Sequence, residues 1–111
     1  MLRGNIFDLP PEAGFGGEFF EDLIAGKAFR LERIVSRGQV TPEGEWYDQE
    51  EDEWVVLLKG RARLLYDSGE KVDLERGDWL LIPSHLKHRV VFTSSDPECI
   101  WLAVHGSFMD P

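Results

Sequence analysis

Short apolar stretches and polar turns alternate along almost the whole chain, and no stretch has the length and spacing of an ordinary helix. Residues 28–35 and 71–74 alternate apolar and polar side chains, which is typical of strands with one buried face. Further short apolar runs, each bounded by Gly, Pro, Asp or Ser, occupy residues 53–59, 61–66, 79–82, 88–93 and 100–104. The pattern predicts an all-β domain, closed as a barrel or folded as a sandwich.

The N-terminal part is less regular. Residues 1–16 combine an apolar Ile6-Phe7 pair with two prolines and a glycine-rich turn, which indicates an arm. In residues 18–25 the apolar side chains also fit helical spacing, but the segment is short and ends at Gly26, so we interpret it as a strand. We therefore predict an N-terminal arm and edge segment at 1–27 and a barrel at 28–111, within one domain.

The strand predicted at 53–59 is apolar on both faces. Val55 and Leu57 share one face, and Trp54, Val56 and Leu58 share the other. A sheet that faces water on one side would alternate instead. A second layer must therefore cover the outer face, either from this chain or from a second subunit, and we expect a homodimer.

Composition limits the class of protein. The chain has 111 residues, and its 12 basic and 21 acidic side chains give a formal net charge of −9. This charge repels nucleic acid and anionic membranes, so we expect neither as a partner. No apolar run approaches the roughly 20 residues of a membrane span. Cys99 is the single cysteine, and with no export signal at the start we expect a cytoplasmic protein.

Two of the three histidines lie in one segment, 77–90. A Gly-Asp turn opens it, Pro83 ends its first strand, and His85 and His88 follow in and after the loop. Imidazoles this close could converge on a metal ion, or serve as ordinary hydrogen-bonded side chains. The third histidine, His105, follows the last predicted strand and is a candidate for binding substrate or for a surface role.

Glu53 is the acidic residue most clearly set apart by its position, because it opens an apolar strand and shares the face of Val55 and Leu57. A buried carboxylate needs a partner, a proton or a metal ion. Without a cation beside it, its pKa should be raised by desolvation. If the chain stays extended, Tyr47 and Gln49 line the same face and offer oxygen ligands.

Three tryptophans, Trp46, Trp79 and Trp101, could form an aromatic wall for a sugar ring, or could fill the core. We include Trp46, with Tyr47 and His105, among the candidate substrate-binding residues.

The spacing of these residues resembles the two motifs of the cupin superfamily, and in particular its small single-domain barrels. Residues 53–60 fit the E-x6-G half of the first motif, and Gly77, Pro83 and His88 fit the second at matching spacing. The resemblance covers roughly residues 28–105. It implies a double-stranded β-helix, or jelly-roll, barrel with one divalent metal held by three histidines and a glutamate.

The chain departs from those motifs at the metal. Tyr47 and Gln49 replace the two histidines of the first motif, so that only Glu53 and His88 carry over as ligands. Other motif residues are replaced too: Thr41 for the leading Gly, His85 for the loop Gly and Phe92 for the closing Asn. A rebuilt site of Gln49, Glu53, His85 and His88 would hold Zn, Mn, Fe or Ni weakly.

Three functions stay open. The first is a barrel that binds a small sugar-like or carboxylate molecule in a central pocket, with or without that weak metal. The second is a metal-dependent enzyme that uses Glu53 and His88 as catalytic residues, either an oxygenase or an isomerase resembling mannose-6-phosphate isomerases. Against a phosphosugar substrate, only Lys87 and Arg89 lie near the second motif to bind phosphate. The third is a barrel with an inactive site that serves as a dimer module.

Overall fold

The computed structural model describes residues 3–14 and 16–109; positions 1–2, 15 and 110–111, which belong to the predicted arm and to the end of the predicted barrel, lie outside this range. Within the described residues the chain forms one short 3-10 helix and eight strands. They are η1 (Pro11–Gly14), β1 (Phe19–Ala25), β2 (Phe29–Ser36), β3 (Asp52–Lys59), β4 (Ala62–Tyr66), β5 (Lys71–Leu74), β6 (Trp79–Ile82), β7 (His88–Thr93) and β8 (Cys99–Gly106). No helix in this part of the chain is long and apolar enough to cross a bilayer.

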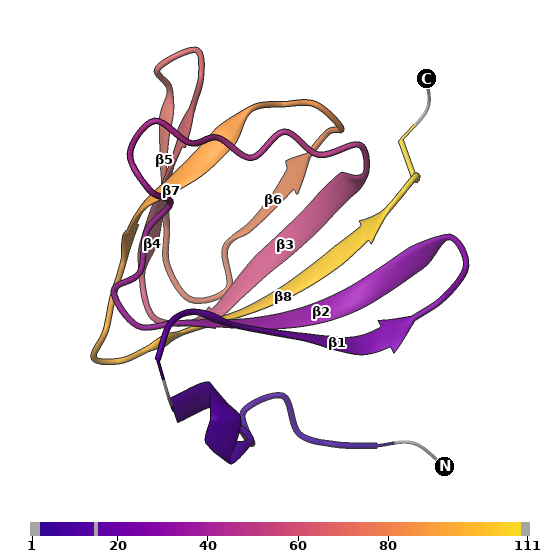
Figure 1. Ribbon diagram of the computed structural model, residues 1–111, viewed down its shortest axis with the longest axis vertical. Coiled ribbons are helices and arrows are strands. Elements are labelled where there is room, and N and C mark those ends of the chain that lie inside the picture. Colours follow the sequence, from indigo (N-terminus) through magenta and orange to yellow (C-terminus); the bar gives the residue numbers. More distant parts are fainter. Residues whose placement is uncertain (1–2, 15, 110–111) are drawn as a thin grey trace.

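The strands form two antiparallel sheets that face each other (Figure 1). The larger sheet has the order β1-β2-β8-β3-β6, and the smaller one has the order β5-β4-β7. This arrangement confirms the all-β jelly-roll prediction. The ambiguous segment 18–25 is indeed a strand, because β1 pairs along its length with β2 at one edge of the larger sheet.

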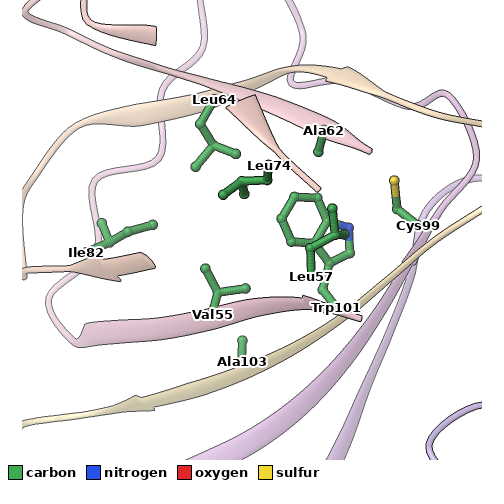
Figure 2. Packing of buried hydrophobic residues seen from close by; sticks show 9 residues of the cluster. All are labelled: Val55, Leu57, Ala62, Leu64, Leu74, Ile82, Cys99, Trp101 and Ala103. Atoms are coloured by element: carbon green, nitrogen blue, oxygen red, sulfur yellow. The ribbon is translucent and has the colours of Figure 1, made fainter. Parts of the chain in front are cut away.

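The apolar core fills the space between the sheets (Figure 2). Val55 and Leu57 on β3 point into it, as their alternation predicted, and Leu57 is fully buried. Leu64 and Leu74 from the smaller sheet meet them from the opposite side, and Trp101 on β8 closes one end. The cavity described below lies beside this core, and its lining includes the core residues Val55, Leu64, Ile82 and Trp101.

The outer face of the larger sheet is also apolar. The register places one apolar row across all five strands, formed by Ile24, Leu31, Val104, Trp54 and Leu81. In the next row Trp79 is 59% exposed, and its ring lies 5.9 Å from that of Trp54. Strand β3 is therefore apolar on both sides, as its sequence indicated, but part of the apolar surface on its outer side faces solvent.

The N-terminal arm is attached to this sheet by a buried arginine. The guanidinium of Arg33 donates to the backbone oxygens of Ile6 (3.0 Å) and Asp8 (3.2 Å) and to the carboxylate of Glu21 (2.9 Å). Arg37 donates to the backbone oxygen of Ala13 in η1. Three backbone oxygens of the arm thus hold it at the β1–β2 edge, and Glu21 is itself a residue of β1.

Candidate functional site

A row of polar side chains crosses the inner face of the larger sheet beside the apolar core. Strand register pairs Arg30 with His105, His105 with Glu53, and Glu53 with Ile82. Side chains that face each other across neighbouring strands have Cβ atoms only about 5 Å apart. Three neighbouring strands, β2, β8 and β3, therefore bring two basic groups and a carboxyl into one neighbourhood, although residue 30 and residue 105 are far apart in the chain.

These residues border a cavity of about 80 Å³. Both sheets and the connection before β3 contribute to its wall, and Phe20 and Tyr47 are partly exposed beside it. The lining residues are Glu18, Phe20, Glu32, Ile34, Tyr47, Gln49, Glu53, Val55, Leu64, Ile82, His88, Val90, Trp101 and His105. Glu53 and His88 thus meet at one cavity inside the barrel, as the sequence predicted.

Glu53 is the buried carboxyl of this cavity, with 7% of the residue exposed. Burial raises its pKa, and the positive potential of His105 and His88 offsets the effect only in part. The direction is the one that desolvation predicts, although the histidines beside Glu53 oppose it. Within the described residues no side-chain or backbone group donates a hydrogen bond to the Glu53 carboxyl, so it can bond to a molecule in the cavity.

His105 is held from the neighbouring strand. Its Nε2 lies 2.9 Å from Oε1 of Glu32, and the residue is 3% exposed. Burial alone would lower the pKa of His105, but the hydrogen bond to Glu32 and the nearby charge of Glu53 outweigh it and raise the pKa. The Glu32 carboxylate also pairs with Arg30 at 3.5 Å. His105 is therefore inclined to carry a positive charge beside Glu53.

His88 has a defined tautomer. Its Nδ1 lies 2.9 Å from the backbone oxygen of Leu86, and because a carbonyl oxygen only accepts, Nδ1 carries the proton. The other nitrogen, Nε2, keeps a free lone pair in the neutral ring. Tyr47 stacks on this imidazole with ring centroids 5.4 Å apart and an interplanar angle of 24°. A neutral imidazole of this kind can accept a proton from a molecule in the cavity.

Two residues predicted for the site lie outside the cavity lining. His85 is exposed, and its Nδ1 lies 2.8 Å from Oδ1 of Asp48, because its backbone adopts a left-handed conformation with φ of 63°. Trp46 packs against Arg89, whose guanidinium carbon Cζ lies 5.7 Å from the centroid of the Trp46 ring. The prediction that these two side chains line the pocket is therefore corrected.

The other predicted residues, Tyr47, Gln49 and His105, do line the cavity. Of the aromatic set, Trp101 lines it as well, whereas Trp79 lies on the outer face of the sheet. Glu18 and Glu32 also line the cavity, and neither was predicted from the sequence. Glu32 had a usable signal, because it lies two residues before the inward-facing Ile34 on the same strand.

Comparison with known proteins identifies the family. The family model described as "Cupin domain" matches residues 34–105, which contain most of the barrel. Glu53, His88 and His105 lie within the match, and Glu18, Arg30 and Glu32 lie before it. The chain belongs to the cupin family. None of the curated proteins compared with the chain matches it.

Solved structures agree with this assignment. A cupin from Ralstonia eutropha JMP134, provisionally named a mannose-6-phosphate isomerase, is 38% identical to this chain; the alignment covers 97% of this chain and 100% of that one, with a TM-score of 0.89. The polyketide cyclase RemF from Streptomyces resistomycificus is 22% identical over 100% of this chain and 82% of its own, with a TM-score of 0.75. The second likeness supports the cupin fold alone.

The cupin motif residues have clear structural reasons in this chain. Gly60 has a φ of 89°, and a Cβ at this position would lie 2.9 Å from the Cα of Cys99. Gly77, with a φ of 94°, turns the chain into β6. Both conformations favour glycine, so these two motif positions are kept by the backbone rather than by the chemistry of the cavity.

The metal implied by the cupin resemblance does not fit the side chains present. Within residues 3–14 and 16–109, no group of three or more His, Cys, Asp and Glu side chains is placed to hold a metal ion. Tyr47 stacks face to face on His88, an arrangement that does not aim its oxygen and the imidazole nitrogen at one point. Burial favours the protonated form of Glu53, which is a poor ligand. His85, a predicted ligand, points away.

We therefore expect the purified protein to retain only substoichiometric metal after incubation with Zn, Mn, Fe(II) or Ni and dialysis, measured by mass spectrometry of the metals. The matched control is the double variant Tyr47→His/Gln49→His, which restores the two histidines of the first cupin motif. This variant should retain metal more tightly than the wild type. A full equivalent on the wild-type chain would show that neutral oxygen ligands complete a site here.

Proposed function

We propose that this cupin binds a small, neutral hydroxylated carbonyl compound in its cavity and moves a proton on it, using Glu53 and His88. The observation that carries the proposal is that one cavity is lined both by the buried Glu53 carboxyl, which accepts no hydrogen bond from the described residues, and by the His88 imidazole, whose Nε2 is free. A buried carboxyl and an imidazole in one cleft are candidates for general acid–base catalysis. A relative that is 38% identical bears an isomerase name, which supports the same class of chemistry.

The step follows from the protonation states. His88 accepts a proton from the carbon beside a carbonyl group at its free Nε2, and the C–H electron pair becomes the double bond of an enediol. Glu53, in its protonated form, donates its proton to the carbonyl oxygen. In the second half of the reaction, His88 returns its proton to the former carbonyl carbon, and the Glu53 carboxylate takes the proton of the other enediol hydroxyl. The second carbon is then the carbonyl carbon, which completes an aldose–ketose isomerisation. The carboxylate of Glu53 that forms on the way is stabilised by the positively charged His105.

The charges around the cavity favour a neutral ligand over an anionic one. Three glutamates and no lysine or arginine are among its described lining residues. Arg30, the nearest guanidinium of the polar row, already lies 3.4 to 3.6 Å from the carboxylates of Glu51, Glu32 and Asp22. A carboxylate ligand would meet like charges, and a phosphate would lack the basic cluster that usually binds it. Of the ligands considered from sequence, the sugar-like one fits better.

The size of the cavity suggests a small reacting group. A cavity of about 150 Å³ holds a benzene molecule, so about 80 Å³ accommodates only a few non-hydrogen atoms. The partly exposed Phe20 and Tyr47 lie where the rest of a longer molecule would emerge.

Hydroxyacetone, the simplest α-hydroxyketone, is therefore a suitable probe. In D₂O the wild-type protein should exchange the carbon-bound hydrogens beside its carbonyl group for deuterium, followed by proton NMR. The control variant Glu70→Gln, whose altered side chain is exposed and outside the cavity lining, should exchange at the wild-type rate. A wild-type rate equal to that of protein-free buffer would contradict the proposal.

We also propose that the outer face of the larger sheet binds a second copy of this chain. Its apolar row of Ile24, Leu31, Val104, Trp54 and Leu81 contains no charge. A chain of net charge −9 repels its own copy except where a surface is free of acidic groups, and this row is such a surface. Five strands about 4.8 Å apart span roughly 20 Å, which suits a patch of the standard size of about 800 Å² per partner.

A flat face of this kind is self-complementary, so a two-fold axis through it pairs equal residues of two copies. The cavity opens on the inner side of the same sheet, so a dimer formed this way leaves it free. The cytoplasmic location stays a prediction from sequence.

A further inference from the structure

The connection between β2 and β3 holds part of the cavity wall without regular secondary structure. Residues 37–51 contain a single isolated bridge, from Tyr47 to His88. Irregular connections of this length in a compact domain are usually functional. This one carries Tyr47 and Gln49, which line the cavity. The contacts that fix these two residues therefore fix the shape of the wall.

His85 provides such contacts, and it does so from an unfavourable backbone conformation. Its φ of 63° lies in the left-handed region, and it is the one non-glycine residue with a positive φ among the described residues. For a residue with a Cβ, this conformation is higher in free energy than it is for glycine. The corresponding position in the cupin motif is a glycine, so this chain keeps a side chain where the backbone favours none.

What the histidine gains is a double contact with the wall. Its imidazole Nδ1 lies 2.8 Å from Oδ1 of Asp48, and its backbone N–H donates to the backbone oxygen of Gln49 at 2.7 Å. Within the described part of the chain, these are the hydrogen bonds that join Asp48 and Gln49 to another segment. Tyr47, next in the chain, exchanges two backbone hydrogen bonds with His88 at 2.8 and 3.1 Å.

We propose that His85 is a positioning residue, whose contact with Asp48 holds Tyr47 and Gln49 in the geometry of the closed cavity wall. A glycine would retain the backbone bond to Gln49 and would relieve the conformation, but it would lose the contact with Asp48. The imidazole therefore serves the wall rather than the stability of the barrel. Its effect on a bound molecule rests on the proposed function, whereas its effect on the wall is a property of the free protein.

The two effects can be separated with the variants His85→Gly and Asp48→Ala. In His85→Gly the relieved backbone and the greater freedom of the unfolded chain oppose each other, so the unfolding midpoint in urea should stay close to that of the wild type. In both variants, hydrogen exchange at the amides of residues 47–50 should become about threefold faster or more, which is the size of effect expected from the loss of one side-chain hydrogen bond. Amides in β3 should keep their rates.

The double variant should exchange no faster at residues 47–50 than His85→Gly alone, because both changes remove the same contact. Ser84→Gly is the control, since it alters the neighbouring loop residue and leaves the contact between His85 and Asp48 in place. With hydroxyacetone as substrate, both His85→Gly and Asp48→Ala should raise KM more than they lower kcat.

The proposal is overturned if exchange at residues 47–50 is unchanged in His85→Gly, or if it quickens by the same factor there and in β3. The second result would make His85 a general stability element. Since hydrogen exchange is measured without any ligand, these outcomes decide the matter even if hydroxyacetone is inert and the proposed function fails.

Discussion

Replacing Glu53 with Gln is expected to slow the deuteration of hydroxyacetone by about 10²- to 10⁴-fold, the usual contribution of a general acid or base. Glutamine keeps the size of the side chain and its hydrogen-bonding reach, but it cannot release and recover a proton at the carbonyl oxygen. The loss should appear in kcat, because binding of the neutral probe needs no charge at position 53. The measurement is the initial exchange rate by proton NMR over a range of probe concentrations.

Glu70→Gln, a change on an exposed turn outside the cavity, should leave the rate unchanged, and His88→Gln should reduce it as strongly as the change at 53. If Glu53→Gln keeps most of the wild-type rate, the carboxyl takes no part in the proton transfer. The site would then be a binding pocket, which is the first of the functions left open by the sequence.

The same variant carries a prediction for stability against pH. Burial raises the folded-state pKa of Glu53 above its ordinary value of 4.5, so the folded protein holds this proton more tightly than the unfolded chain. The stability due to the protonated carboxyl is fully present below the unfolded pKa and is lost as pH rises through the folded pKa. Glu53→Gln should therefore flatten the decline of unfolding free energy above pH 4.5, measured by urea denaturation at several pH values.

The two central residues of the site could be predicted from sequence for simple reasons. Val55 and Leu57 need a core, and strict alternation then turns Glu53 inward with them. Pro83 ends a strand, so the chain must turn and begin a new strand near His88. Both inferences are local, and each depends on a strong pattern of only a few residues.

The remaining residues depended on information that the sequence does not carry locally. Glu32 and His105 meet because β2 pairs with β8 across more than 70 positions, and nothing near either residue announces this pairing. Glu32 also lies in a strand that alternates apolar and polar side chains, and such a strand is expected to bury Phe29 and Leu31 rather than Glu32. Alternation from Ile34 turns Glu32 inward instead, and the structure follows this second pattern.

His85 was misplaced for a different reason. Its spacing from His88 suggested convergence, but the direction of a side chain in a loop depends on the backbone angles, and a left-handed residue points elsewhere. The usable signal was its position, because it stands where the cupin motif has glycine. A non-glycine residue there is a sign of a special backbone and of a contact that maintains it.

The variant Trp79→Lys, alone or with Leu81→Lys, is expected to convert the wild-type dimer into monomers and to raise the dimer dissociation constant at least about 100-fold. Trp79 is the most exposed large apolar side chain of the outer face, and it lies next to Trp54 on the edge strand β6, so a dimer through this face buries its ring. A lysine there loses the aromatic contact and must also leave a charge in an apolar interface. Sedimentation equilibrium over a range of concentrations measures the effect.

Phe92→Lys is the matched control, because Phe92 is an exposed aromatic residue on the smaller sheet, away from this face. It should leave the dimer intact, and neither variant should change the deuteration of hydroxyacetone, since the cavity lies on the inner side of the larger sheet. A wild-type protein that is monomeric at all concentrations would contradict the dimer. A dimer that survives Trp79→Lys/Leu81→Lys would place the contact on another surface, and the apolar row would then need a different cover.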